Sequence, residues 1–170
     1  MYLLRKVLFS FILIITTFNL EPIKTINKSI GFRDLDVNLL EAYHNYEGRL
    51  IINKIGLNEV FYNKNNPLNN IDNGLEVLTP SIMPDKGNYI IFIASHSGNS
   101  KISYFKNLDK LDLNDDIILS YQDKDYHYKV IEKEIVDKTG LLNIKSFPLN
   151  SLVLITCVKD SNKQLIVICK

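Results

Sequence analysis

Short apolar runs separated by turn signals dominate the chain from Gly48 onward. The candidate strands are residues 50–55, 59–62, 76–78, 89–95, 116–121, 126–134, 151–157 and 163–169. Turn signals such as Asn-Pro, Asp-Asn-Gly and Asp-Lys-Gly-Asn lie between them. One segment, residues 103–111, is predicted to form a short helix. Many short strands at this spacing predict an all-β barrel or sandwich with one or two helical turns.

The first twenty residues have the layout of an export signal, because Arg5 and Lys6 precede a long apolar stretch. That stretch is about 14 residues, or roughly 21 Å as a helix, against a hydrocarbon core of about 30 Å. No pair of small residues marks a cleavage site. We therefore expect residues 1–20 to be an uncleaved membrane anchor, with a cleaved signal peptide as the alternative. The charges before the stretch predict that the rest of the chain lies outside the cytoplasm.

Residues 21–47 are predicted to be a tether with a short amphipathic helix, and residues 48–170 the folded domain. The chain of 170 residues carries 20 Lys+Arg and 19 Asp+Glu, a net charge of +1, which argues against a nucleic-acid binder. Its two cysteines form no CxxC or Cys/His cluster, and no EF-hand or nucleotide-binding motif occurs. We therefore expect no metal and no other cofactor.

Two of the predicted strands are apolar almost throughout, which indicates that both of their faces are covered. Residues 89–94 run directly into Ser95 and His96, and residues 152–155 run into Thr156 and Cys157. If the two strands are parallel neighbours, His96 and Cys157 share one rim of the barrel. A thiolate is a strong nucleophile, and a nearby imidazole exchanges protons with a leaving group. This pair is the candidate catalytic centre.

A third candidate follows from the last two strands, which are joined by a loop short enough to force an antiparallel pair. If Cys157 faces Gln164, the two side chains project to the same face of the sheet. The Gln164 amide then donates a hydrogen bond to an oxyanion at the thiol. A register shifted by one residue replaces it with the cation of Lys163. The sequence leaves both registers open.

The other histidines and the second cysteine are weaker candidates. Alternation puts His127 on the solvent face, and His44 belongs to the N-terminal segment. Cys169 pairs opposite the start of the preceding strand, about five rungs or roughly 17 Å from Cys157. We therefore expect no disulfide between the two cysteines.

The segments around Cys157 and His96 resemble those of the sortase family. Leu154-Ile155-Thr156-Cys157, a short polar loop and the apolar residues 165–168 are similar to the family's C-terminal signature. Residues 93–98 with 104–111 resemble its histidine segment and the helix that follows. Residues 52–57 resemble its opening strand. The resemblance covers about residues 48–170.

This resemblance implies an eight-stranded β-barrel and a membrane-tethered cysteine transpeptidase outside a Gram-positive-type cell. Such enzymes cut an LPxTG-like sorting signal of secreted proteins, form a thioester and pass the product to an amine of the cell wall or a pilin. Cys157 matches the nucleophile and His96 the acid/base. The family's third residue is an arginine before the last strand, where this chain has Lys163 and Gln164. Thr156 matches the motif and is expected to line the substrate groove.

Two other functions remain as alternatives to the transpeptidase. A thiol endopeptidase hydrolyses the same Cys157 thioester with water and anchors nothing. A non-catalytic, membrane-tethered β-barrel binds envelope peptides without chemistry, and the missing arginine favours it slightly. The three hypotheses share one fold and differ in whether Cys157 reacts and in which acceptor takes the acyl group.

Overall fold

The computed structural model describes residues 45–139 and 147–170. The expected anchor (residues 1–20), nearly all of the tether (residues 21–47) and His44 therefore lie outside the described residues. Among the described residues, no helix has the length and apolar character needed to cross a membrane.

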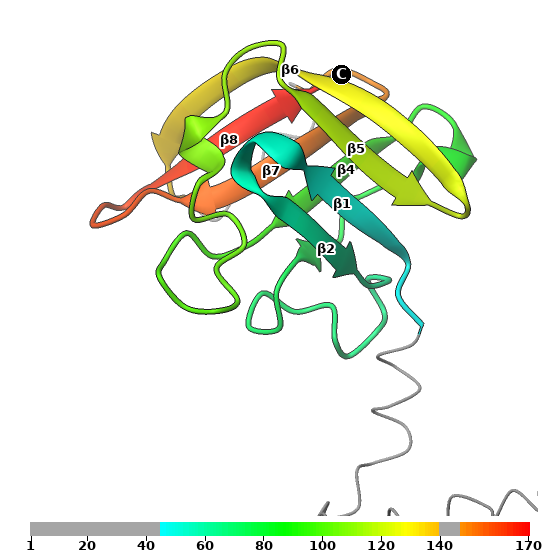
Figure 1. The fold of residues 1–170 in the computed structure, drawn as a ribbon, viewed down its shortest axis with the longest axis horizontal. Coiled ribbons are helices and arrows are strands. Elements are labelled where there is room, and N and C mark those ends of the chain that lie inside the picture. Colours follow the sequence, from blue (N-terminus) through cyan, green and yellow to red (C-terminus); the bar gives the residue numbers. More distant parts are fainter. Residues whose placement is uncertain (1–44, 140–146) are drawn as a thin grey trace, which may run out of the picture. The chain divides into compact units, whose positions relative to one another are not determined.

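The domain is an eight-stranded, nearly closed β-barrel, so the predicted all-β fold is confirmed (Figure 1). The strands follow the order β2-β1-β5-β6-β8-β7-β4-β3. Their bounds are β1 Gly48–Ile52, β2 Leu57–Phe61, β3 Glu76–Val77, β4 Ile90–Ala94, β5 Asp116–Tyr121, β6 Lys124–Asp137, β7 Ser151–Cys157 and β8 Lys163–Cys169. Three of these, β5, β7 and β8, have the predicted bounds.

The strands β4 and β7 form a parallel pair at the centre of one half of the sheet. Every residue of β4 is buried, as is every residue of β7 before Cys157. Both faces of the pair are covered, which explains why these segments are apolar throughout. Ile91, Ile93, Leu152 and Leu154 belong to the main core inside the barrel.

A second, smaller core lies on the other face of the same strands. It contains Phe92, Val153, Ile155 and Ile166, and Phe147 packs on Phe92 edge to face with ring centroids 5.3 Å apart. Side chains at alternate positions of β7 therefore point to two different cores. Cys157 follows Ile155 by two positions and lies on the face of the second core.

Two predicted elements differ from the structure in extent. The predicted helix at residues 103–111 is a series of turns that ends in a 3₁₀ turn at Leu108–Lys110. Its backbone hydrogen bonds span three residues, and the Phe105 N–H donates to the carbonyl of His96 instead of to its own segment. The predicted strand 126–134 extends to Asp137, because β6 pairs first with β5 and then, past a bulge at residues 130–132, with β8.

Candidate active site

The ends of β4 and β7 are fixed against each other by backbone and side-chain hydrogen bonds. Ala94 pairs with Ile155, and the next N–H, that of Ser95, donates to the Ile155 carbonyl at 3.2 Å. The Thr156 hydroxyl donates to the Ser95 carbonyl at 2.7 Å. His96 is the residue after Ser95, and Cys157 is the residue after Thr156. The structure thus places both residues at one rim of the barrel, as the parallel arrangement predicts.

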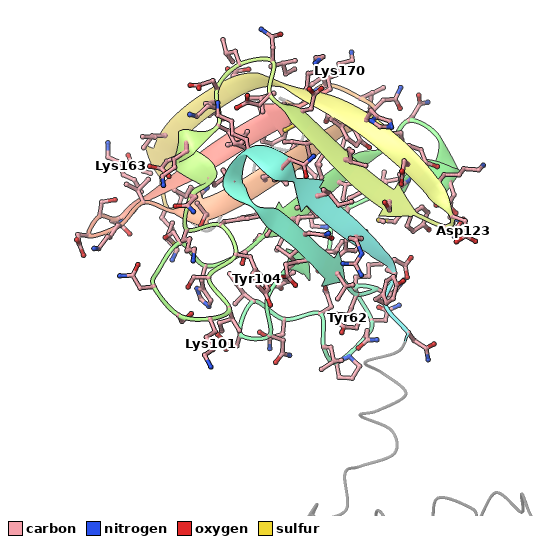
Figure 2. The ribbon with its side chains drawn as sticks, viewed as in Figure 1. Tyr62, Lys101, Tyr104, Asp123, Lys163 and Lys170 are labelled. Atoms are coloured by element: carbon pink, nitrogen blue, oxygen red, sulfur yellow. The ribbon has the colours of Figure 1, made fainter. Side chains whose placement is uncertain are left out.

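The register of the β7–β8 hairpin puts Gln164 opposite Cys157 and Ile166 opposite Ile155. This is the register on which the Gln164 prediction depended. Gln164 also pairs with Val136 of β6, so Val136, Gln164 and Cys157 form one rung across three strands. Lys163 pairs with Asp137 and projects to the opposite face of the sheet. Figure 2 shows Lys163 at the start of β8 and Lys170 beyond its other end.

The His96 ring contacts a carboxylate that the sequence analysis did not single out. Nε2 of His96 lies 3.3 Å from Oδ1 of Asp72, and the imidazole side chain is 39% exposed. Within residues 45–139 and 147–170, the hydrogen-bond partner of this ring is Asp72 rather than Cys157. Because a carboxylate only accepts, Nε2 is the donor and Nδ1 is the acceptor of the neutral ring. Asp72 is the single acidic residue of the Asn-rich loop 63–73. No local pattern in this loop marks it as a partner of His96.

The Cys157 thiol contacts a lysine that the sequence analysis also missed. Nζ of Lys138 lies 3.5 Å from Sγ of Cys157. Lys138 follows the end of β6, beyond the predicted end of that strand at residue 134. Ile135 and Val136 are apolar and β-branched, and this signal for a longer strand was available in the sequence.

A pocket of about 560 Å³ opens beside Cys157. Its walls include Thr156, Ser97, Phe105 and Leu165. Thr156 thus lines a pocket next to the thiol, but the residue is only 6% exposed and its hydroxyl donates to the Ser95 carbonyl. The hydroxyl therefore holds β7 to the end of β4.

The second cysteine is far from this site and is chemically different. Cys169 is fully buried at the opposite end of the hairpin, where it pairs with Leu152. Burial raises the pKa of its thiol to about 12. Both cysteines are free, in agreement with the prediction that they form no disulfide. His127 is exposed, also as predicted. The described residues contain no cluster of three or more His, Cys, Asp and Glu side chains able to hold a metal ion.

The family model of the Sortase domain matches residues 50–170, which is most of the chain and the whole barrel except the first two residues of β1. This chain belongs to the sortase family. No curated protein matches it. The family agrees with the resemblance found in the sequence, and it implies cysteine transpeptidase chemistry for the domain.

Solved sortase structures share the fold of this chain. Sortase C2 of pilus island 1 of group B Streptococcus aligns at a TM-score of 0.65 and 21% identity, over 74% of this chain and 73% of that chain. A lid mutant of sortase A from Corynebacterium diphtheriae gives 0.63 and 21%, over 73% and 68%. Sortase C1 of pilus island 1 of group B Streptococcus gives 0.63 and 19%, over 74% and 64%. This sortase thus spans less than two thirds of the last of these chains.

The residue opposite the thiol in this sortase has a neutral side chain. Gln164 lies opposite Cys157 and is half-buried. It provides amide hydrogens but no positive charge. Lys163, the adjacent cation, is exposed on the other face. Among the described residues, the cation that contacts the thiol is Lys138, just past the end of β6.

Proposed function

We propose that this sortase is a membrane-anchored cysteine transpeptidase that cleaves a C-terminal sorting signal of secreted proteins. Cys157 is the nucleophile, His96 the acid/base and Gln164 a donor to the oxyanion. The acyl product passes to an amine of the cell wall or of a pilin. The observation that carries this proposal is the parallel pairing of β4 with β7, whose ends lead to His96 and Cys157 at one rim, with an open pocket beside Cys157.

The reaction consists of two acyl transfers at Cys157. The thiolate attacks the carbonyl carbon of the scissile peptide bond, so a C–S bond forms. The C–N bond then breaks, and protonated His96 gives a proton to the leaving amine. In the second transfer an acceptor amine attacks the thioester, a C–N bond forms and the C–S bond breaks. The proton of the amine passes to His96, which restores the starting state.

The location of the reaction follows from the N-terminal segment, which lies outside the described residues. Residues 1–20 anchor the chain in the cell membrane in a single pass, and residues 21–47 hold the barrel on the extracellular side. The basic residues Arg5 and Lys6 before the apolar stretch support this orientation. An anchored enzyme meets secreted substrates as they leave the membrane.

The test is a cleavage assay with and without an amine acceptor. Peptides that contain LPxTG-like motifs are incubated with the protein and hydroxylamine, and the products are identified by mass spectrometry. We expect a hydroxamate product that disappears in Cys157→Ala, since a thiol-to-methyl change removes the nucleophile and little volume. Formation of free acid alone at every amine concentration would identify a thiol endopeptidase. Unchanged cleavage by Cys157→Ala would disprove the proposed nucleophile.

The non-catalytic alternative has a separate readout. A barrel that only binds peptides has no need for a reactive thiol, so Cys157 would show no faster alkylation than a cysteine in a short peptide. Selective alkylation of Cys157 by iodoacetamide, together with turnover, excludes this alternative. The buried Cys169 serves as an internal reference for an unreactive thiol.

A further inference from the structure

The contact between Lys138 and Cys157 joins a strand end to the proposed nucleophile. Nζ lies 3.5 Å from Sγ, the distance of a direct contact between a donor and a sulfur atom. Lys138 follows β6 directly and Cys157 is the last residue of β7, and β8 lies between these two strands. The lysine side chain therefore spans β8 to reach the thiol. Two strand spacings are roughly 9–10 Å, which the combined length of the lysine and cysteine side chains covers.

The register explains why Lys138 points toward this thiol. Val136 is in the same rung as Gln164 and Cys157, and Lys138 is two positions further along the chain, immediately after the end of β6. Residues two apart in a strand project to the same face, so Lys138 lies on the face of the thiol. Its backbone N–H donates to the carbonyl of Asn162 at 3.0 Å, which continues the pairing of β6 with the β7–β8 hairpin.

The charges around the thiol also indicate that this contact is functional. An ammonium group beside a thiol favours the thiolate, the form that attacks a carbonyl carbon. The residue directly opposite Cys157 is the neutral Gln164, and the adjacent Lys163 points away. Among the described residues, the other ionisable groups on this side of the barrel are the His96–Asp72 pair at the end of β4 and the side chains that line the pocket. These lining groups are Lys106, Asp109, Lys133, Glu134 and Lys159.

We infer that Lys138 is a catalytic residue of this sortase, the cation that stabilises negative charge on the Cys157 sulfur as it attacks. This inference rests on the proposed function, since it assigns the charge next to the proposed nucleophile. It separates two roles: the residue after β6 supplies the positive charge, and β8 supplies, through Gln164, a neutral hydrogen-bond donor. The sulfur that Lys138 contacts is the atom that forms and breaks the C–S bond.

The experiment measures the alkylation of Cys157 by iodoacetamide against pH, without any peptide substrate. Lys138→Ala should move the midpoint of the rate profile upward by about half a pH unit to one pH unit. This shift of the midpoint is smaller than the shifts found for buried ion pairs, because Lys138 is exposed and salt screens the contact. At pH 7 and low ionic strength the rate should fall about three- to tenfold. In 1 M NaCl the difference should shrink.

Two further variants separate a direct contact from a general charge effect. Lys138→Arg keeps the charge and should keep the midpoint. Lys170→Ala removes one positive charge from an exposed residue beyond the other end of β8 and should leave the midpoint unchanged (Figure 2). Equal shifts in Lys138→Ala and Lys170→Ala, or no shift in either, would overturn the inference. A Lys138→Arg profile that matches Lys138→Ala would do the same.

The outcome is independent of the test of the proposed function. If Cys157→Ala abolishes amide formation while Lys138→Ala leaves the alkylation profile unchanged, the transpeptidase stands and the role of Lys138 fails. If Cys157→Ala leaves turnover intact, the proposed function fails whatever the profile shows. Melting temperatures of the variants check the fold, and we expect no change because the Lys138 side chain is exposed.

Discussion

The imidazole of His96 is held by a carboxylate, and this contact decides which ring nitrogen is available for chemistry. Nε2 faces Asp72 at 3.3 Å, so Nδ1 is the nitrogen left to exchange a proton with the substrate amine. Asp72 is exposed, and a carboxylate in water interacts weakly with its partner. The structure therefore gives Asp72 a positioning role that is smaller than the role of the ring itself.

Removing the His96 ring should therefore slow turnover more than removing the charge of Asp72. His96→Ala should lower kcat by at least about a hundredfold, the usual contribution of a positioned acid/base. Asp72→Asn keeps a side chain of the same size and should lower kcat only about three- to tenfold, with little change in KM. Steady-state kinetics on one peptide substrate measure both. A loss of only a few-fold in His96→Ala would reduce His96 to a structural role.

The residues of the site differ in how far the sequence predicts them. Cys157 and His96 each end an apolar run, and buried parallel strands that end together bring such residues to one rim. Asp72 and Lys138 contact these residues from a loop and from the end of a partly polar strand. Their contacts depend on the conformation of one loop and on one strand register, which no local pattern in the sequence encodes.

At the scale of elements, the β7–β8 hairpin gives Gln164 and Lys163 different environments. Alternation puts Gln164 on the face of the thiol and Lys163 on the other face. Gln164→Ala should lower kcat about ten- to hundredfold, less than the loss of an oxyanion donor in a closed site, because Gln164 is half-buried. Lys163→Ala should stay within about twofold of the parent. Parallel kinetic assays of the two variants measure the difference.

A third variant adds a direct check on this position. Gln164→Arg restores the residue expected in the family and should retain or increase activity. Greater damage from Lys163→Ala than from Gln164→Ala would mean that the hairpin in solution has the register shifted by one. Two alanine variants with near-parent rates would leave Cys157, His96 and backbone N–H groups to carry the reaction.

The elements themselves were predictable where one period dominates. The strands β5, β7 and β8 were predicted with their bounds, because apolar runs and alternation are unambiguous there. The end of β6 was missed because its second half lies beyond a bulge and pairs with β8 instead of β5. The helix at 103–111 was wrong in extent because the backbone N–H groups of this segment bond to carbonyls three residues back, as in 3₁₀ turns, and not four residues back as in an α-helix.

At the scale of the whole molecule, the barrel holds its two cysteines in different environments. Cys157 lies at the rim beside a pocket, whereas Cys169 is fully buried in the main core. Burial penalises the charged thiolate and raises the pKa of Cys169 from 9.0 to about 12. The unfolded chain therefore loses this proton at a lower pH than the folded barrel does.

This difference makes the stability of the barrel fall at alkaline pH. Where the unfolded state binds fewer protons than the folded state, the free energy of unfolding decreases as pH rises. For Cys169 the decrease begins near pH 9, the value for an exposed thiol, and ends near pH 12. Between pH 8 and pH 10 this one group should remove about 1.4 kcal/mol. Urea unfolding at the two pH values measures the loss.

The contribution of Cys169 is isolated by comparing variants over the same pH step. Burial also raises the pKa of Tyr121 and of Tyr128, and their loss of stability has the same sign. These tyrosines are present in every variant, so they cancel in the difference. Cys169→Ala should lower stability at pH 8 through a small cavity, yet lose about 1.4 kcal/mol less than the parent on going to pH 10. Val167→Ala is the matched control, because it opens a cavity in the same core without removing a titratable group, and it should lose as much as the parent. An equal loss in the parent and in Cys169→Ala would show that the thiol is not shielded from water in the folded barrel.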